Sequence, residues 1–284
     1  MTGESDNPAA RPVGVFDSGL GGLTVVRQIL QRMPGEDIVY LGDSARVPYG
    51  TKSPQTIRQF ALQDAAFLLR FDPKIIVAAC NTASAVALEE LRRRLFVEVV
   101  GVVAPAAARA VALAGGRPIG VIGTEATIAS GAHRRAIAEL DGTAQVVAAA
   151  APLLVPIVEE GRPQDDPIVL SVLSDYLRDL QRARPGILIL GCTHYPLLSR
   201  AIAKLMGPDT HLLDAGAATA EVVQGRLRER GLLNAQPAGK LKCFSTDTAE
   251  RFARLARRFL GRDVDEVTWV GTDELAARDG VTRT

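Results

Sequence analysis

The stretch VGVFDSGLGGLTVVRQIL, residues 13–30, places three local patterns in a row. A short apolar run leads to Asp17, a glycine-rich turn follows at residues 18–22, and apolar residues then recur at helical spacing from Leu23. A strand, a tight turn and a helix in this order form the repeating unit of α/β proteins. The stretch therefore indicates the fold class, and its turn is the first candidate for a ligand-binding loop.

The same alternation of strand and helix continues along the chain. Strands are expected at residues 13–17, 37–42, 74–80, 98–103, 118–123, 144–150, 186–192, 210–215, 240–246 and 267–271. Helical patterns lie between them, for example at residues 23–33, 56–70, 84–95 and 166–181. Several strands are continuous runs of Val, Ile and Leu, which is typical of strands covered on both faces. The sequence predicts an α/β fold with mostly parallel sheet.

Two of these strands resemble each other. Residues 75–82, IIVAACNT, and residues 188–194, LILGCTH, are both apolar runs that end in a cysteine followed by small polar residues. They lie roughly 110 residues apart, about the length of one α/β domain. We therefore expect two similar domains that face each other, each contributing one cysteine-tipped strand.

The composition is that of an ordinary globular protein: of 284 residues, 47% are hydrophobic and 23% are charged. The formal net charge of +1 gives no overall field that would attract nucleic acid or an anionic membrane. Residues 1–12 lack the apolar segment of a signal peptide, and the longest apolar run, residues 146–158, contains prolines and is too short to span a membrane. With three cysteines, we expect a cytoplasmic protein with reduced thiols.

The glycine-rich turn does not match the loops that bind nucleotides. A dinucleotide fingerprint requires Gly or Ala where Thr24 stands, and the chain contains no P-loop pattern. The carboxylate of Asp17 would also repel a phosphate. Two interpretations remain: the glycines only permit a tight turn, or Asp17 and Ser18 bind a small ligand that carries a cation.

Cys80 and Cys192 are the main candidates for catalysis, because each ends a predicted strand, at the sheet edge where α/β proteins bind ligands. A helix that begins after such a strand lowers the pKa of a thiol. Each cysteine is followed directly by residues that form hydrogen bonds, namely Asn81 and Thr82 in one case and Thr193 and His194 in the other. Cys243 lies inside a predicted strand and is expected to be a core residue.

Several chemistries use two thiols. The chain has no Cys-x-x-Cys motif or Cys/His cluster, so no metal site is expected. A redox pair needs the two Cβ atoms close together, and a thiol protease needs one cysteine with a histidine and an orienting partner. Two equivalent thiols on opposite sides of a ligand favour another chemistry, in which a proton leaves one face of a carbon and another arrives on the opposite face. His194 is placed to polarise Cys192, whereas His133 and His211 are expected to be structural.

Two further loops follow predicted strands. Tyr49 and Gly50 offer a hydroxyl and an unobstructed backbone amide to a carboxylate, and Thr124 and Thr127 stand at an expected helix start. Ordinary capping loops have the same composition, so this alternative stays open. Residues 250–262 follow the pattern of an amphipathic helix whose arginines we expect on a solvated face.

Four motifs in order resemble the signatures of bacterial glutamate racemases, in the aspartate/glutamate racemase family: FDSGLGGLTV at 16–25, GDSARVPYG at 42–50, AACNTAS at 78–84 and LGCTHYP at 190–196. The resemblance runs from about residue 12 to residue 272. It implies two similar α/β domains with the active site in the cleft between them. The first would comprise residues 1–101 and 211–284, with residues 1–12 disordered, and the second residues 102–210.

The resemblance also implies an activity, the interconversion of L- and D-glutamate without a cofactor, which supplies D-glutamate for peptidoglycan. An aspartate or hydantoin racemase is the alternative. Cys80 and Cys192 would be the two acid/base thiols. The implied substrate-binding positions are Asp17, Ser18, Tyr49, Gly50, Asn81, Thr82, Thr193 and His194. The implied supporting positions are Asp43, Glu160, Thr124 and Thr127.

The resemblance further implies partners. Members of the family form homodimers, and no membrane or nucleic-acid partner is expected. Some members are reported to inhibit DNA gyrase, and the basic helix at residues 250–262 would be a candidate surface for that contact.

Overall fold

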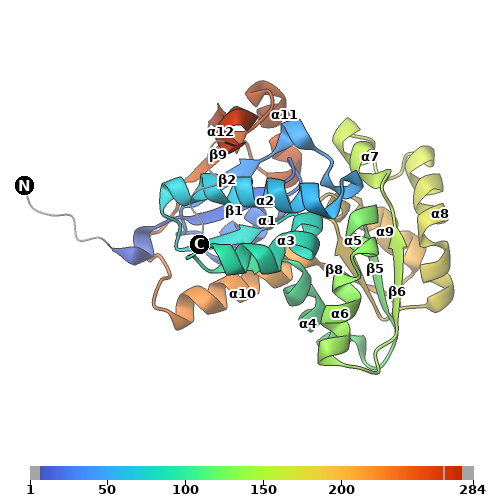
Figure 1. The fold of residues 1–284 in the computed structure, drawn as a ribbon. Coiled ribbons are helices and arrows are strands. Elements are labelled where there is room, and N and C mark those ends of the chain that lie inside the picture. Colours follow the sequence, from blue (N-terminus) through green and yellow to red (C-terminus); the bar gives the residue numbers. More distant parts are fainter. Residues whose placement is uncertain (1–6, 265, 277–284) are drawn as a thin grey trace, which may run out of the picture.

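The structure, a computed structural model, describes residues 7–264 and 266–276. Within these residues, ten strands form two separate sheets (Figure 1). The strands are β1 (Val13–Asp17), β2 (Ile38–Gly42), β3 (Ile75–Ala78), β4 (Val99–Gly101), β5 (Ile119–Gly123), β6 (Val146–Ala150), β7 (Ile187–Gly191), β8 (His211–Asp214), β9 (Leu241–Ser245) and β10 (Val267–Trp269). Every predicted strand is present, and the predicted α/β fold is confirmed.

The α-helices are α1 (Leu23–Arg32), α2 (Pro54–Leu68), α3 (Asn81–Arg94), α4 (Val103–Ala114), α5 (Glu125–Ala129), α6 (Ala132–Leu140), α7 (Leu154–Glu160), α8 (Pro167–Ala183), α9 (Ser199–Met206), α10 (Ala215–Glu229), α11 (Ala249–Leu260) and α12 (Thr272–Ala276). Short 3-10 turns are η1 (Pro8–Ala10), η2 (Ser44–Arg46), η3 (Tyr49–Thr51), η4 (Leu69–Phe71) and η5 (Tyr195–Leu198).

Both sheets are parallel throughout. The first has the strand order β10-β9-β2-β1-β3-β4, and the second has the order β6-β5-β7-β8. Parallel pairing brings the carboxyl ends of all strands in a sheet to one edge, and the loops that follow the strands gather there. The candidate site residues stand in those loops.

Helices cover both faces of the first sheet. Val13 and Val15 of β1 belong to a core that includes residues of α1 and α10, whereas Phe16 points to the opposite face, into a core shared with α2 and α3. This alternation along one strand explains why β1 reads as a continuous apolar run, since both of its faces are buried. In the second sheet, α4 to α6 and α8 with α9 lie on opposite sides of the strands (Figure 1).

The strand β8 revises the expected division of the chain. It pairs in parallel with β7 of the second sheet, with Ile187 opposite His211 and Leu190 opposite Asp214. The four residues that follow the predicted boundary at residue 210 therefore extend the second sheet, and α10 follows them. Leu212 and Leu213 of this segment pack against the core of the second sheet.

The start of the described chain is also more ordered than expected. Asn7 caps the turn η1, and the buried ammonium of Lys74 donates to the carbonyl of Ala9 at 2.6 Å and lies 2.5 Å from Glu36 Oε2. The predicted disorder is therefore wrong for residues 7–12, while residues 1–6 lie outside the described residues. A buried cation needs acceptors, and a carbonyl of this segment is one of them.

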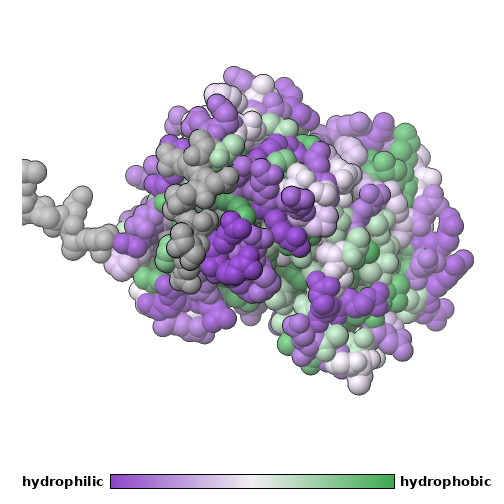
Figure 2. All heavy atoms as spheres, viewed as in Figure 1, coloured by the Kyte–Doolittle hydropathy of each residue, from purple (hydrophilic) through white to green (hydrophobic). Residues whose placement is uncertain are grey.

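The surface carries mostly hydrophilic side chains on the face over α2 and α3, while more hydrophobic residues are exposed over the second sheet (Figure 2). There β6 forms the edge of the sheet and is half-buried. In the described part of the chain, no helix has both the length and the apolar character needed to cross a membrane.

Candidate active site

The loops that follow β1, β3 and β7 bring the predicted catalytic residues together. Asp17 is the last residue of β1, Cys80 caps the N-terminus of α3, and Cys192 directly follows β7. Both thiols are buried and neither forms a disulfide. Cys192 lies near enough to Cys80 to raise the pKa of the Cys80 thiol electrostatically. The two sheets therefore present their cysteines to one common site, as the repeated strand pattern indicated.

The turn after β1 contacts the loop that holds Cys192. Thr193 Oγ1 donates to Asp17 Oδ1 at 3.3 Å, and Thr24 Oγ1 donates to the carbonyl of Thr193 at 3.0 Å. A Cβ atom on Gly21 would overlap Thr193 Oγ1, so a side chain at this position would push the two loops apart. Glycine is required here for close approach, and the turn does more than reverse the chain direction.

Asp17 is fully buried, and burial raises the pKa of its carboxyl, against a lowering effect of His194 and of hydrogen bonds from the backbone. One of these bonds comes from the amide of Gly19 to Asp17 Oδ2 at 3.0 Å. The predicted partner Ser18 accepts a hydrogen bond from the Cys80 thiol, with Sγ and Oγ 3.7 Å apart.

The environment of Cys80 holds it in the protonated form. Burial raises the pKa of its thiol to about 12, and the nearby carboxylate of Asp17 adds to this effect. A thiolate inside an apolar site loses its hydration, and a negative neighbour destabilises it further. Cys80 is therefore a thiol at neutral pH, able to donate a proton.

Cys192 has a different set of neighbours. Its sulfur lies 3.9 Å from His194 Nδ1, and His194 Nε2 lies 3.1 Å from Glu159 Oε1. Burial by itself would lower the pKa of His194, but the interactions with Cys192 and Glu159 prevail and raise it to about 10. The imidazole is therefore an imidazolium at neutral pH, and both of its N–H groups have an acceptor. The Cys192 sulfur therefore lies beside a cation, unlike that of Cys80.

The carboxylate that pairs with His194 is Glu159, and the predicted position Glu160 is wrong. The hydrogen bond from His194 lowers the pKa of Glu159, which keeps this carboxyl ionised. The side chain of Glu160 is exposed and lies 3.4 Å from Arg162 instead. Consecutive residues of α7 point about 100° apart, so only one of the two glutamates can face the site.

Three threonine hydroxyls meet where α3 contacts α5. Thr82 Oγ1 lies 2.8 Å from Thr124 Oγ1 and 3.1 Å from Thr127 Oγ1, and the latter two are 2.9 Å apart. Thr124 also caps α5 by accepting from the amide of Thr127 at 3.3 Å. A Cβ on Gly50 would lie 2.6 Å from Thr124 Cβ, so the loop after β2 closes against this cluster. The structure thus joins the four predicted residues Gly50, Thr82, Thr124 and Thr127.

The hydroxyl of Tyr49 is not available to a substrate carboxylate, contrary to the prediction. It donates to Asp43 Oδ2 and lies 2.8 Å from Asp64 Oδ2, and the ring is fully buried. Arg46 bonds both carboxylates, at 2.6 Å and 3.1 Å. Burial and the neighbouring Asp43 raise the pKa of Asp64 well above its ordinary value. This buried network fixes the loop that carries Gly50.

Asp43 forms no hydrogen bond to either thiol within the described residues. Its two oxygens accept from Tyr49, Arg46 and Thr246, and none of these partners is a cysteine. Asp64 could not be identified from the sequence, where it stands within the helical pattern of residues 56–70. A carboxyl group within a helix of mostly apolar residues has no local signature of burial.

Asn81 supplies an unused acceptor. Its side chain is buried at the N-terminus of α3, next to Cys80, and its Oδ1 has no hydrogen-bond partner within the described residues. Buried polar atoms in native proteins are almost always paired, so an orphaned acceptor points to a group that a bound ligand provides.

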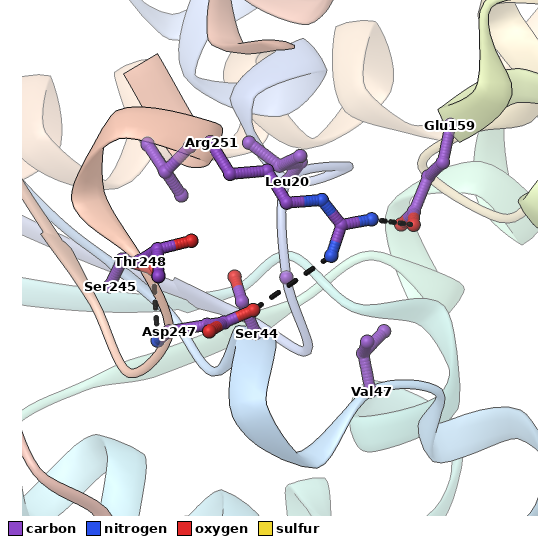
Figure 3. A pocket seen from close by; sticks show the side chains of 10 residues that line it. Leu20, Ser44, Val47, Glu159, Ser245, Asp247, Thr248 and Arg251 are labelled. Carbon is purple, nitrogen blue, oxygen red and sulfur yellow. Dashed lines mark hydrogen bonds and ion pairs between the residues drawn. The ribbon is translucent and has the colours of Figure 1, made fainter. Parts of the chain in front are cut away.

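A pocket opens beside the His194–Glu159 pair (Figure 3). Its lining includes Glu159 of α7, Leu20 of the turn after β1, and Arg251 of α11. Figure 3 shows Arg251 between Glu159 and Asp247, with an ion pair to each. The sequence did not single out Arg251, which is one of several arginines in residues 250–262.

The fold consists of two parallel sheets covered by helices, and each sheet has a cysteine at its carboxyl edge that faces one buried site. These features define an isomerase of the amino-acid racemase class. The model of the Asp/Glu/Hydantoin racemase family matches residues 14–223. The chain belongs to this family, among the bacterial glutamate racemases.

The similarity extends over nearly the whole chain. A glutamate racemase of Geobacter metallireducens is 44% identical over 264 residues, which cover 93% of this chain and 97% of that protein. The crystal structure of a glutamate racemase isoform of Bacillus anthracis superposes with a TM-score of 0.88 at 37% identity, covering 91% of this chain and 97% of that one. The glutamate racemase of Francisella tularensis, crystallised with D-glutamate, has a TM-score of 0.86 at 36% identity and covers 93% and 99%.

Proposed function

We propose that this racemase interconverts L- and D-glutamate with two thiols, Cys80 and Cys192: one removes the α-proton, and the other delivers its own proton to the opposite face. The observation that carries the proposal is the opposite environment of the two sulfurs. Cys80 is a buried thiol with a pKa of about 12, whereas the Cys192 sulfur lies 3.9 Å from Nδ1 of the His194 imidazolium. One acid and one base are what a proton exchange at a single carbon requires.

The chemical step balances with these two groups alone. The Cys192 thiolate takes the α-proton from one face of the substrate, and the electron pair of the broken C–H bond remains on the α-carbon and its carboxylate. The Cys80 thiol then delivers its proton to the opposite face. Afterwards Cys80 is the thiolate and Cys192 the thiol, which is the arrangement that the reverse reaction needs.

The substrate's charged groups have candidate partners in the site. Asp17 and the unused Oδ1 of Asn81 would accept from the ammonium. Thr82, with the hydroxyls of Thr124 and Thr127 behind it, and the backbone amide of Gly50 would donate to carboxylate oxygens. Donors held in fixed positions stabilise the negative charge that develops when the proton leaves. The bound D-glutamate of the Francisella tularensis enzyme supports this choice of substrate.

The proposed role in the cell is the supply of D-glutamate for peptidoglycan. This role rests on membership of the glutamate racemases, and the proposed mechanism uses only groups of the chain itself.

Proton NMR in D₂O, combined with chiral chromatography and mass spectrometry to separate the two isomers, tests substrate and mechanism together. The wild-type protein with L-glutamate should lose the α-proton signal as optical activity falls to zero. In a two-thiol mechanism, solvent deuterium appears first in the newly formed D-isomer, because the donating thiol has exchanged with solvent while the remaining L-glutamate keeps its proton. Deuteration of aspartate in preference to glutamate would overturn the substrate assignment, and equal early deuteration of both isomers would overturn the two-thiol mechanism.

A further inference from the structure

The helix α11 contacts the Cys192 side of the site, although it belongs to the first sheet. It joins β9 to β10, and its apolar face, which includes Phe252, Ala256 and Phe259, is buried. The sequence pattern placed all of its arginines on a solvated face. Arg251, Arg254 and Arg257 are all exposed, but the guanidinium of Arg251 also reaches Glu159 on the second sheet's side of the site.

Arg251 forms the first of these contacts. Its guanidinium lies 3.9 Å from Glu159 Oε2 and 3.8 Å from Asp247 Oδ2 (Figure 3). The other oxygen of Glu159 is the one that accepts from His194. The cation of Arg251 also lowers the pKa of the Glu159 carboxyl, after the larger effect of the His194 hydrogen bond.

Phe259 and Arg258 form the second set of contacts, about two turns further along α11. The ring of Phe259 meets the ring of His194 edge-on, with centroids 5.2 Å apart and an interplanar angle of 79°. A Cβ at Gly161, which ends α7, would lie 2.9 Å from Arg258 Nη1. One helix of the first sheet therefore contacts both members of the His194–Glu159 pair and the end of the helix that carries Glu159.

We propose that Arg251 is a positioning residue for the reaction: by holding Glu159 ionised and in place against His194, it sustains the thiolate of Cys192 from the opposite sheet. The proposal rests on the proposed function, since it assigns Cys192 the role of base. Arg251 contacts Glu159, Glu159 accepts a hydrogen bond from the imidazolium of His194, and His194 lies beside Cys192. In this proposal the charge of Arg251 therefore supports the thiolate of Cys192 through Glu159 and His194.

Other charged groups near the His194–Glu159 pair also influence how strongly Arg251 affects the thiolate of Cys192. Asp17 faces His194, Asp247 faces Arg251, and the thiol of Cys80 lies near that of Cys192. Loss of Arg251 would leave the negative charge of Asp247 without this partner, which further disfavours a thiolate at Cys192. Because Arg251 is half exposed, water screens its ion pairs, and effects of exposed pairs are modest.

The test compares the alkylation rates of the two cysteines by iodoacetamide, resolved by peptide mass spectrometry at pH 7 and low salt. Only the thiolate reacts, and the ratio of the Cys192 rate to the Cys80 rate cancels any general opening of the site. Arg251→Gln should lower this ratio by about two- to five-fold, the range of exposed ion pairs. Arg251→Lys should restore it, and 1 M NaCl, with a Debye length of about 3 Å, should remove the difference from wild type.

Arg254→Gln is the matched control, because it removes the same charge from the same helix at an exposed position that does not line the pocket. It should leave the ratio unchanged. An unchanged ratio in Arg251→Gln, an equal fall in Arg254→Gln, or an equal change at both cysteines would overturn the proposal. Alkylation needs no turnover, so these results are independent of the racemisation assay, which tests the proposed function by itself.

Discussion

Gly21 and Thr193 are in contact, although they stand in loops that follow strands of different sheets. A Cβ atom on residue 21 would have no room beside Thr193 Oγ1. The turn after β1 and the loop after β7 are held in mutual contact here, and Cys192 directly precedes Thr193. The glycine therefore controls the position of a thiol that lies far away in the sequence.

Gly21→Ala should displace the Cys192 loop and lower kcat/KM by about 100-fold, the usual consequence of moving a reacting group by about 1 Å. Steady-state racemisation assays measure this. The control is Gly225→Ala in α10, where an added Cβ meets nothing within 4 Å. That variant should keep full activity and gain about 0.4–1 kcal/mol in the free energy of unfolding. Full activity in Gly21→Ala would show that the two loops are not in tight contact.

Tyr49→Phe should reduce stability and leave substrate binding intact. The hydroxyl satisfies two buried carboxyl groups, Asp43 and Asp64, so its removal should cost about 1–3 kcal/mol in the free energy of unfolding. Urea denaturation measures this cost. KM for glutamate should stay at the wild-type value, whereas Gly50→Ala, which crowds Thr124, should raise KM. A higher KM with unchanged stability in Tyr49→Phe would mean that the hydroxyl binds the substrate after all.

His133 should make the protein less stable in acid. Burial lowers its pKa from 6.5 to about 4, and neither ring nitrogen has a hydrogen-bond partner within the described residues. In the unfolded chain His133 takes up a proton as the pH falls through 6.5, whereas in the folded chain it does so only near pH 4. Between these two values the unfolded state binds more protons, so the stability that the protein has above pH 6.5 falls as the pH is lowered to about 4.

His133→Phe should flatten the dependence of the free energy of unfolding on pH between about 6.5 and 4, by up to about 1.4 kcal/mol per pH unit. Urea titrations of both proteins at several pH values in this window measure the slope. Parallel slopes for the variant and the wild type would contradict the assignment of a neutral, buried His133.

The strands could be predicted because both faces of each sheet are covered, which turns every inner strand into a run of Val, Ile and Leu such as residues 187–190. Cys80 and Cys192 could be predicted because they follow such runs, at the edge where parallel strands end. These features depend on neighbouring residues in the chain, and a local pattern is sufficient to find them.

Glu159, Asp64 and Arg251 could not be chosen from the sequence. Glu159 and Glu160 are identical in type, and only the phase of α7 against the Cys192 loop decides between them. Asp64 is buried by partners from the loop after β2, and Arg251 differs from Arg254 only in what lies opposite to it. Each choice depends on a contact between distant segments, which a local pattern does not contain.

The central claim, that two thiols serve opposite faces of one carbon, is tested most directly by the rate of glutamate racemisation in Cys80→Ser and Cys192→Ser. Circular dichroism and thermal melting first establish that each variant is folded. Both variants should lose racemisation, because a single thiol reaches only one face of the α-carbon. Racemisation at the wild-type rate in both variants would contradict the account.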